Sequence, residues 1–191
     1  NQYIPFALEE ASLDFCVVGP AANSQGDVEV LIAATRKEKV DDRMALADAA
    51  GLKLTVMDVE SYAGRMALSR LIQQLPNQGE NTTVALFEIG SQATSMQVLR
   101  DDKVLYDREQ PFGSAQLLKL IVRQYGLTME EAVIKRRNAD LPDDYATSVL
   151  DPFVTNVSNE IGRALQFFFT STQHSSVDYI MLSGEAGIFG G

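Results

Sequence analysis

The spacing of hydrophobic positions changes several times along this chain, and the changes predict a series of strands and helices. Short apolar runs between turn residues are typical of strands, whereas apolar residues three or four apart are typical of helices. In the first part of the chain these patterns predict two strands, a helix that ends before Gly51, a third strand and a second helix. These predicted elements cover residues 12–18, 28–35, 37–50, 53–59 and 60–74.

A polar stretch at residues 76–81 follows, and it is the predicted boundary between two lobes. Three strands then form a predicted meander, in which Asp101 and Asp102 make the second turn. Helical spacing returns after them, with a capping-box sequence that begins at Thr128. The predicted strands cover residues 83–88, 95–101, 103–110 and 178–182, and the predicted helices cover residues 114–125, 128–138 and 147–170. The predicted fold class is therefore mixed α/β with two lobes.

Composition and charge narrow the classes of function. The chain has 191 residues, 46% of them hydrophobic, which is enough for a sizeable core. Sixteen basic and 26 acidic residues give a formal charge of −10, which argues against binding of nucleic acid or anionic lipid, since both need clustered Lys and Arg. The one cysteine, Cys16, lies in an apolar run and is predicted to be a small buried side chain. No apolar run is long enough to span a bilayer.

The turn after the first strand of the meander is a candidate phosphate site. An apolar run reaches Glu88, turns at Gly90 and passes Ser91, Gln92 and Thr94 before the next strand. An acid beside such a turn can face Mg²⁺ or its waters, while the N–H groups and hydroxyls of the turn meet phosphate oxygens. The spacing E-x-G-x-x-x-T is short, so the motif is weak when it is taken alone.

A second candidate lies where the final predicted strand ends, at Ser183-Gly184-Glu185. Small residues allow the backbone to approach a flat ligand such as a purine, and a helix start can carry an anion. Taken alone, this turn is better interpreted as a glycine-rich loop. Together with the acid, glycine and hydroxyls of the first turn, it indicates a nucleotide site.

Eight segments occur in an order that resembles the superfamily of actin, Hsp70 and sugar kinase ATPases. Within that superfamily the chain is most similar to the PilM family of type IV pilus assembly proteins, relatives of the division protein FtsA. The segments are QYIPFALEEASLDF, VLIAATRKE, VMDVESYAGRMAL, LFEIGSQATSMQVL, DREQPFGSAQL, LPDDY, RALQFFF and YIMLSGEAG. Each is a weak to moderate motif, whereas all eight in the right order make a strong resemblance.

The resemblance implies an actin-like (ribonuclease H-like) two-lobe α/β fold, here partial. It implies a small FtsA-like subdomain of the 1C type at residues 1–52, followed by the end of the first lobe with an interlobe helix at residues 53–80. The second lobe then covers residues 81–191, with a helical portion at about residues 127–150.

The resemblance also implies roles for individual residues, with ATP and Mg²⁺ as the cofactors of a full-length protein. Glu88 stands where the superfamily usually has Asp and would reach Mg²⁺ through water, while Glu185 replaces the usual second glycine of the adenosine motif. An ordinary helix N-cap is an equally good interpretation of Ser114. The implied nucleotide-binding residues are Glu88, Gly90, Ser91, Gln92, Thr94, Gly113, Ser114, Gly184 and Glu185.

Two departures from the superfamily pattern concern completeness. No D-x-G sequence precedes Glu88, and the family continues beyond the adenosine motif. We therefore expect a fragment that lacks one phosphate loop and the closing helices. A fragment with only one of the two phosphate-binding loops is expected to bind nucleotide weakly or not at all.

The function that the resemblance implies is a cytoplasmic, ATP-binding scaffold of type IV pilus assembly and twitching motility. It would be held at the inner membrane only through protein partners: the cytoplasmic N-terminal peptide of PilN and other inner-membrane pilus proteins. Self-association is compatible with this function. The residues implied to bind the partner peptide are Tyr3, Ile4, Pro5, Phe6, Arg36 and Lys37.

Two alternatives belong to other classes of function: an FtsA-like filament-forming division protein, and an ATPase or phosphotransferase of the same superfamily. An enzyme would need a group that orients the attacking oxygen. In the phosphate region only Glu88 and Gln92 are candidates, and both are more simply nucleotide ligands. The scaffold is therefore the favoured hypothesis, with weak ATPase activity at most.

Overall fold

The computed structural model describes residues 4–21, 24–101 and 103–184, and the structural statements below concern these residues. By its internal contacts the chain divides into two units, Asn1–Leu68 and Ser69–Gly191. Each unit contains strands and helices, so the prediction of a mixed α/β fold is confirmed.

The first unit is built on a β-hairpin. Strands β1 (Ala11–Pro20) and β2 (Val28–Arg36) pair antiparallel with one irregularity, and their positions agree with the two predicted strands. The short 3₁₀ helix η1 (Leu8–Glu10) precedes the hairpin and helix α1 (Lys37–Ala49) follows it. Helix α1 ends before Gly51 as predicted, and the φ of 71° at Gly51 lies in the left-handed region that favours glycine.

Residues 52–59 form neither helix nor strand, so the prediction of a strand at residues 53–59 is wrong. The segment has the apolar side chains of a strand, and both Leu54 and Val56 are exposed. No strand in the described part of the chain pairs with it, and an extended segment becomes a stable strand only through hydrogen bonds to a neighbour. Helix α2 (Glu60–Ile72) then begins as predicted and crosses the division between the two units.

The hairpin of the first unit exposes much of its apolar surface. Phe15 is 70% exposed and Ile32 is 61% exposed, although both belong to strands. Cys16 is also exposed, so the prediction of a buried cysteine is wrong. A sheet of two strands cannot bury both of its faces, and the apolar run alone does not show how many strands will pair.

The second unit contains a four-stranded sheet in the order β5-β4-β3-β6. Strands β3 (Thr83–Ile89), β4 (Thr94–Arg100) and β5 (Lys103–Gln110) form the predicted antiparallel meander. Strand β6 (Tyr179–Gly184) lies parallel to β3, on the side opposite β4. The parallel arrangement brings the carboxyl ends of β3 and β6 to one edge of the sheet.

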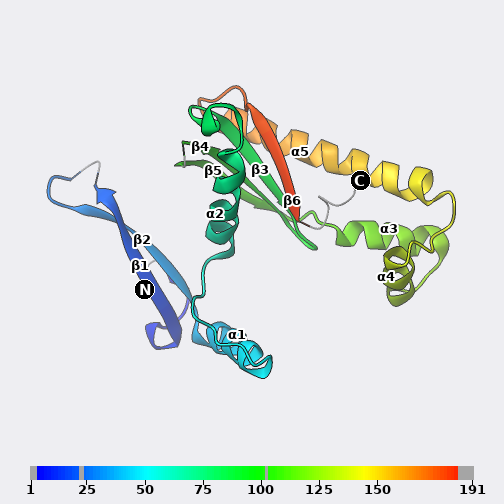
Figure 1. Cartoon of the computed structure of the whole chain (residues 1–191), viewed down its shortest axis with the longest axis horizontal. Helices are drawn as coiled ribbons and strands as arrows, with labels where there is room; N and C mark the ends of the chain where they lie inside the picture. Colours follow the sequence, from blue (N-terminus) through cyan, green and yellow to red (C-terminus); the bar gives the residue numbers. More distant parts are fainter. Residues whose placement is uncertain (1–3, 22–23, 102, 185–191) are drawn as a thin grey trace. The chain divides into compact units, whose positions relative to one another are not determined.

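Helix α5 (Asp151–Ser171) covers one face of this sheet (Figure 1). The strands bury alternate residues against it, and the helix contributes Ala164 and Phe168, which is fully buried. The rings of Phe168 and Tyr106 of β5 form an edge-to-face pair with 5.5 Å between the ring centroids. The buried residues of this core are Ala85, Phe87, Met96, Val98, Ala164 and Phe168.

A second core lies in the helical portion formed by α3 (Ala115–Tyr125), α4 (Met129–Arg137) and the start of α5. The capping box predicted at Thr128 is confirmed, because its hydroxyl accepts from the N–H of Glu131 while the Glu131 carboxylate accepts from the N–H of Thr128. The predicted helix at residues 147–170 begins with a π-helical turn, η3 (Ala146–Leu150), before α5. The buried residues of this core are Phe112, Leu117, Ile121, Ala132, Val149 and Phe153.

Candidate functional site

The carboxyl ends of β3 and β6 place two of the candidate segments side by side. Glu88 lies opposite Ser183, and Ile89 lies opposite Gly184. Gly184 has a φ of 86°, and a Cβ atom there would come within 2.9 Å of the carbonyl carbon of Ile89. Only glycine fits this close approach without a shift of the backbone. The strand order therefore joins the acid of the first motif to the glycine of the second.

The turn between β3 and β4 is closed by a 2.9 Å hydrogen bond from the N–H of Gly90 to the carbonyl of Ala93. The side chains of Ser91 and Gln92 are exposed, so both can reach a ligand. Thr94 is only 1% exposed, and its hydroxyl donates a 2.7 Å hydrogen bond to the carbonyl of Phe112. The hydroxyl proton of Thr94 thus holds the turn in place rather than facing the solvent.

The start of α3 is attached to the same turn. The N–H groups of Ser114 and Ala115 donate 2.9 Å hydrogen bonds to the carbonyls of Gly90 and Ser91. A Cβ atom on Gly113 would lie 2.6 Å from the carbonyl oxygen of Gly90, which makes glycine necessary there. These two N–H groups are used within the chain, so Gly113 and Ser114 contribute by fixing the turn.

The structure brings together all the predicted nucleotide-binding residues that it describes. Glu185 lies outside the described residues. The residues gathered at the edge are Glu88, Gly90, Ser91, Gln92, Thr94, Gly113, Ser114 and Gly184.

Two supporting residues at this edge were missed in the sequence. Phe112 accepts from Thr94 and stacks on Phe153, with 6.1 Å between the ring centroids. Gln110 ends β5 opposite Thr94, and its buried Nε2 atom has no hydrogen-bond partner. In the sequence, only their position just before Gly113 points to them. That position becomes informative once the turn after β3 is known to pack against residues 110–114.

Few carboxylates are available at this edge to bind a metal ion. Glu88 is half-buried between Ser95 of β4 and Ser183 of β6. Among the described residues, no group of three His, Cys, Asp or Glu side chains could hold a metal ion. Mg²⁺ commonly keeps several waters and binds through one or two carboxylates together with substrate phosphates. One carboxylate at this edge fits a water-mediated contact with such an ion.

The residues predicted to bind a partner lie at the base of the hairpin in the first unit. The Arg36 guanidinium lies 5.7 Å from the centre of the Phe6 ring, a cation–π arrangement. Lys37 donates a 2.7 Å hydrogen bond from Nζ to the carbonyl of Glu9. Ile4 and Pro5 directly precede Phe6, and Tyr3 lies outside the described residues.

The resolved pKa shifts lie in the helical portion, away from the edge of the sheet. Hydrogen bonds from the N–H and then the hydroxyl of Thr128 hold the pKa of Glu131 below its ordinary value. Burial raises the pKa of Tyr145. Burial also raises the pKa of Tyr125, assisted by the hydrogen bond that its hydroxyl donates to Asp144. These shifts reflect burial of the two tyrosines and hydrogen bonding at Glu131, and they assign no acid or base to the candidate site.

Comparison with known proteins identifies one family and one fold. The family model described as "Type IV pilus assembly protein PilM" matches residues 1–191. A solved PilM-PilN type IV pilus biogenesis complex matches with 28% identity and a TM-score of 0.70, over 100% of this chain and 54% of that chain.

Two further solved structures show the fold alone. The ethanolamine utilization protein EutJ from Carboxydothermus hydrogenoformans matches with 17% identity and a TM-score of 0.52, over 76% of this chain and 47% of that chain. The archaeal actin homolog Ta0583 matches with 13% identity and a TM-score of 0.51, over 85% of this chain and 51% of that chain. The actin-like fold is therefore confirmed. The chain spans about half the length of the solved relatives that it matches.

Proposed function

The chain belongs to the PilM family of type IV pilus assembly proteins, and on that premise we propose that it is part of an actin-like scaffold that binds ATP and is recruited by PilN. ATP would bind at the edge formed by the turn after β3, the start of α3 and the end of β6. The convergence of these three segments, which are far apart in sequence, is the observation that carries the proposal.

The residues at the edge fit one side of a triphosphate site. At Gly113 and Gly184 a Cβ atom would collide with a neighbouring carbonyl group, so the three backbone segments at this edge lie in close contact. Ser91 and Gln92 expose polar side chains from a turn that is itself held rigidly. When bound, Mg-ATP supplies a polyphosphate whose negative charge is partly neutralised by the metal, and Glu88 would hold a water of that metal.

A scaffold fits this edge better than an efficient enzyme does. Hydrolysis requires a group that orients the attacking water, and the available side chains are Glu88 and Gln92. Glu88 is half-buried between two strands, and Gln92 is exposed on the turn. We propose that bound ATP stabilises one arrangement of the scaffold and is hydrolysed slowly at most.

The partner side of the proposal concerns the first unit. The matched structure is described as a PilM-PilN complex, and the match covers the whole of this chain. The hairpin exposes large apolar side chains such as Phe15 and Ile32, which a partner segment can cover. We propose that the N-terminal peptide of PilN docks near Phe6 and Arg36 and holds the scaffold, from the cytoplasmic side, at the inner-membrane pilus proteins.

Among the helices of the described residues, none combines the length and apolar character that a bilayer crossing requires. The proposal that membrane association occurs through partners is tested separately, by flotation of the full-length protein with vesicles in the presence and absence of PilN. Flotation without PilN would contradict it.

The nucleotide proposal is tested by measuring ATP binding and turnover on the same full-length protein. We expect saturable Mg-ATP binding with a turnover below about 1 s⁻¹, which is the lower end of ordinary enzyme rates. Faster turnover would identify an ATPase or phosphotransferase instead of a scaffold.

A further inference from the structure

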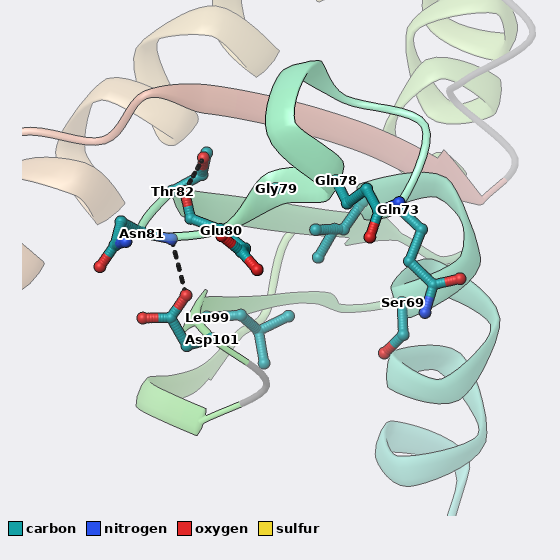
Figure 2. A pocket seen from close by; sticks show the side chains of 10 residues that line it. Ser69, Gln73, Gln78, Gly79, Glu80, Asn81, Thr82, Leu99 and Asp101 are labelled. Carbon is teal, nitrogen blue, oxygen red and sulfur yellow. Dashed lines mark hydrogen bonds between the residues drawn. The ribbon is translucent and has the colours of Figure 1, made fainter.

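A cavity of about 450 Å³ lies at the end of the sheet away from the Gly90 turn (Figure 2). It opens where α2 ends, where the connector to β3 runs, and where β4 meets the turn that leads to β5. All of its lining residues belong to the second unit. They are Ser69, Ile72, Gln73, Gln78, Gly79, Glu80, Asn81, Thr82, Leu99 and Asp101.

The walls of this cavity are held in a fixed conformation. The N–H of Asn81 donates a 2.7 Å hydrogen bond to Oδ1 of Asp101, which ties the connector to the turn after β4 (Figure 2). Gly79 is buried with a φ of 76°, and a Cβ atom there would strike the side chain of Ile72. The connector therefore packs directly on α2 and is tied to the turn after β4.

The charged side chains of the lining are both acidic. Glu80 and Asp101 supply carboxylates, while the amides of Gln73 and Gln78 can accept as well as donate hydrogen bonds. No lysine, arginine or histidine within the described residues lines the cavity. Arg100 is not among the lining residues, but its Nε lies 3.9 Å from Oδ2 of Asp101, while Oδ1 of Asp101 accepts from the N–H of Asn81.

Size and ligand type distinguish between possible occupants. Pockets for small-molecule ligands are about 300–1,000 Å³, so this cavity exceeds what a single metal ion needs. It also lacks the three carboxylate, histidine or cysteine groups that a metal site would need among the described residues. An arginine side chain suits the lining, since its guanidinium has five donors and no acceptor and its aliphatic stem can lie on the half-buried Ile72.

We propose that this cavity is a docking site for an arginine side chain carried by a peptide segment of a partner protein. The guanidinium would pair with Glu80 and Asp101, and the neighbouring peptide residues would fill the remaining volume. Docking here does not involve the nucleotide edge, so the proposal does not depend on ATP binding.

The test uses the full chain labelled with ¹⁵N and titrated with the peptide acetyl-Ala-Arg-Ala-amide. We expect shifts of the amide signals of Gly79, Asn81 and Thr82 that saturate in the millimolar range. The matched peptide with citrulline in place of arginine has the same shape without the charge, and we expect it to bind about tenfold more weakly. Equal shifts with both peptides would overturn the proposal, as would shifts that map to another surface.

Two variants locate the contact. Glu80→Gln keeps the size of the side chain and removes its charge, and Asp101→Asn keeps the Oδ1 acceptor for Asn81 at a φ of 50° that asparagine tolerates. Each should weaken arginine-peptide binding about three- to fivefold, the range for partly exposed charge pairs. Glu130→Gln on the exposed surface of α4 is the control and should change nothing. Unchanged binding by Glu80→Gln, with an unaltered melting temperature, would overturn the proposal.

A third arm separates a peptide site from a site for free polyamines. Spermidine carries positive charge but has no planar guanidinium and no peptide backbone. We expect it to bind the cavity more weakly than the arginine peptide does. Tighter binding of spermidine than of the peptide would reject a protein partner.

Discussion

The N–H of Ser114 donates a 2.9 Å hydrogen bond to the carbonyl oxygen of Gly90, and this bond joins the start of α3 to the turn after β3. Through Phe112 and Leu117, the same segment belongs to the core of the helical portion. The candidate phosphate turn is thus anchored to the helical portion as well as to the sheet. A ligand that displaces the turn would therefore also displace the start of α3.

Gly113→Ala tests how tightly the turn and α3 are packed. The added Cβ would lie 2.6 Å from the carbonyl oxygen of Gly90, so either the turn or the helix must move. We expect a loss of about 1–3 kcal/mol in the free energy of unfolding, measured by urea denaturation, which is typical of overpacking.

Gly162→Ala is the matched control for this substitution. Apart from the adjoining backbone of α5 itself, no atom lies within 4 Å of the Cβ position, and alanine is favoured over glycine in a helix by up to about 1 kcal/mol. We therefore expect Gly162→Ala to leave stability unchanged or to raise it. A Gly113→Ala protein as stable as the Gly162→Ala protein would show that the two segments are not in close contact.

The capping box at α4 predicts a specific dependence of stability on pH. Hydrogen bonds from Thr128 lower the pKa of Glu131, so the ionised carboxylate is favoured in the folded state. Its contribution is present above the ordinary pKa of glutamate and is lost as the pH falls through the lowered pKa of the folded state. Glu131→Gln should therefore be less stable than the parent at pH 7, and the difference should shrink in acid.

Thermal unfolding of both proteins between pH 7 and pH 3 checks this prediction. Glu130→Gln, one residue earlier on the exposed side of the same helix, serves as the control. A gap between Glu131→Gln and the parent that stays constant across the range would mean that the carboxylate charge does not contribute.

The partner proposal predicts that the N-terminal peptide of PilN binds the full-length protein with a dissociation constant below about 1 mM, which corresponds to about −4 kcal/mol. Arg36→Ala removes the cation–π contact with Phe6 and should weaken binding about two- to fivefold. Arg163→Ala removes an exposed arginine that pairs with Glu160 in the other unit and should leave binding unchanged. No detectable binding at millimolar peptide would reject this docking site.

Much of the second unit could be predicted because its signals are local. Alternating apolar residues predicted the meander. The capping-box sequence of Thr128 and Glu131 predicted the start of α4. The predicted strand at residues 53–59 failed because a strand is stabilised by its neighbour, and the pattern of one segment does not reveal whether a neighbour exists.

The candidate site was predictable as a set of residues but not as an arrangement. The motif around Glu88 and the one around Gly184 are recognisable in the sequence, whereas their contact depends on parallel pairing between strands far apart in the chain. The role of Gly113 was also hidden. A glycine before a helix suggests an open N-terminus, yet here the first N–H groups of the helix are bonded to the carbonyls of the turn.

The most direct test of the central claim is equilibrium binding of ATP to the full-length protein and to its Glu88→Ala variant, with Mg²⁺ and with EDTA. We predict that Glu88→Ala lowers affinity about tenfold or more in Mg²⁺ and has little effect in EDTA, because the carboxylate acts through the metal. Glu88→Asp should retain binding, and Glu130→Ala on the exposed surface of α4 should bind like the parent. Equal affinity of Glu88→Ala and the parent in Mg²⁺ would contradict the account.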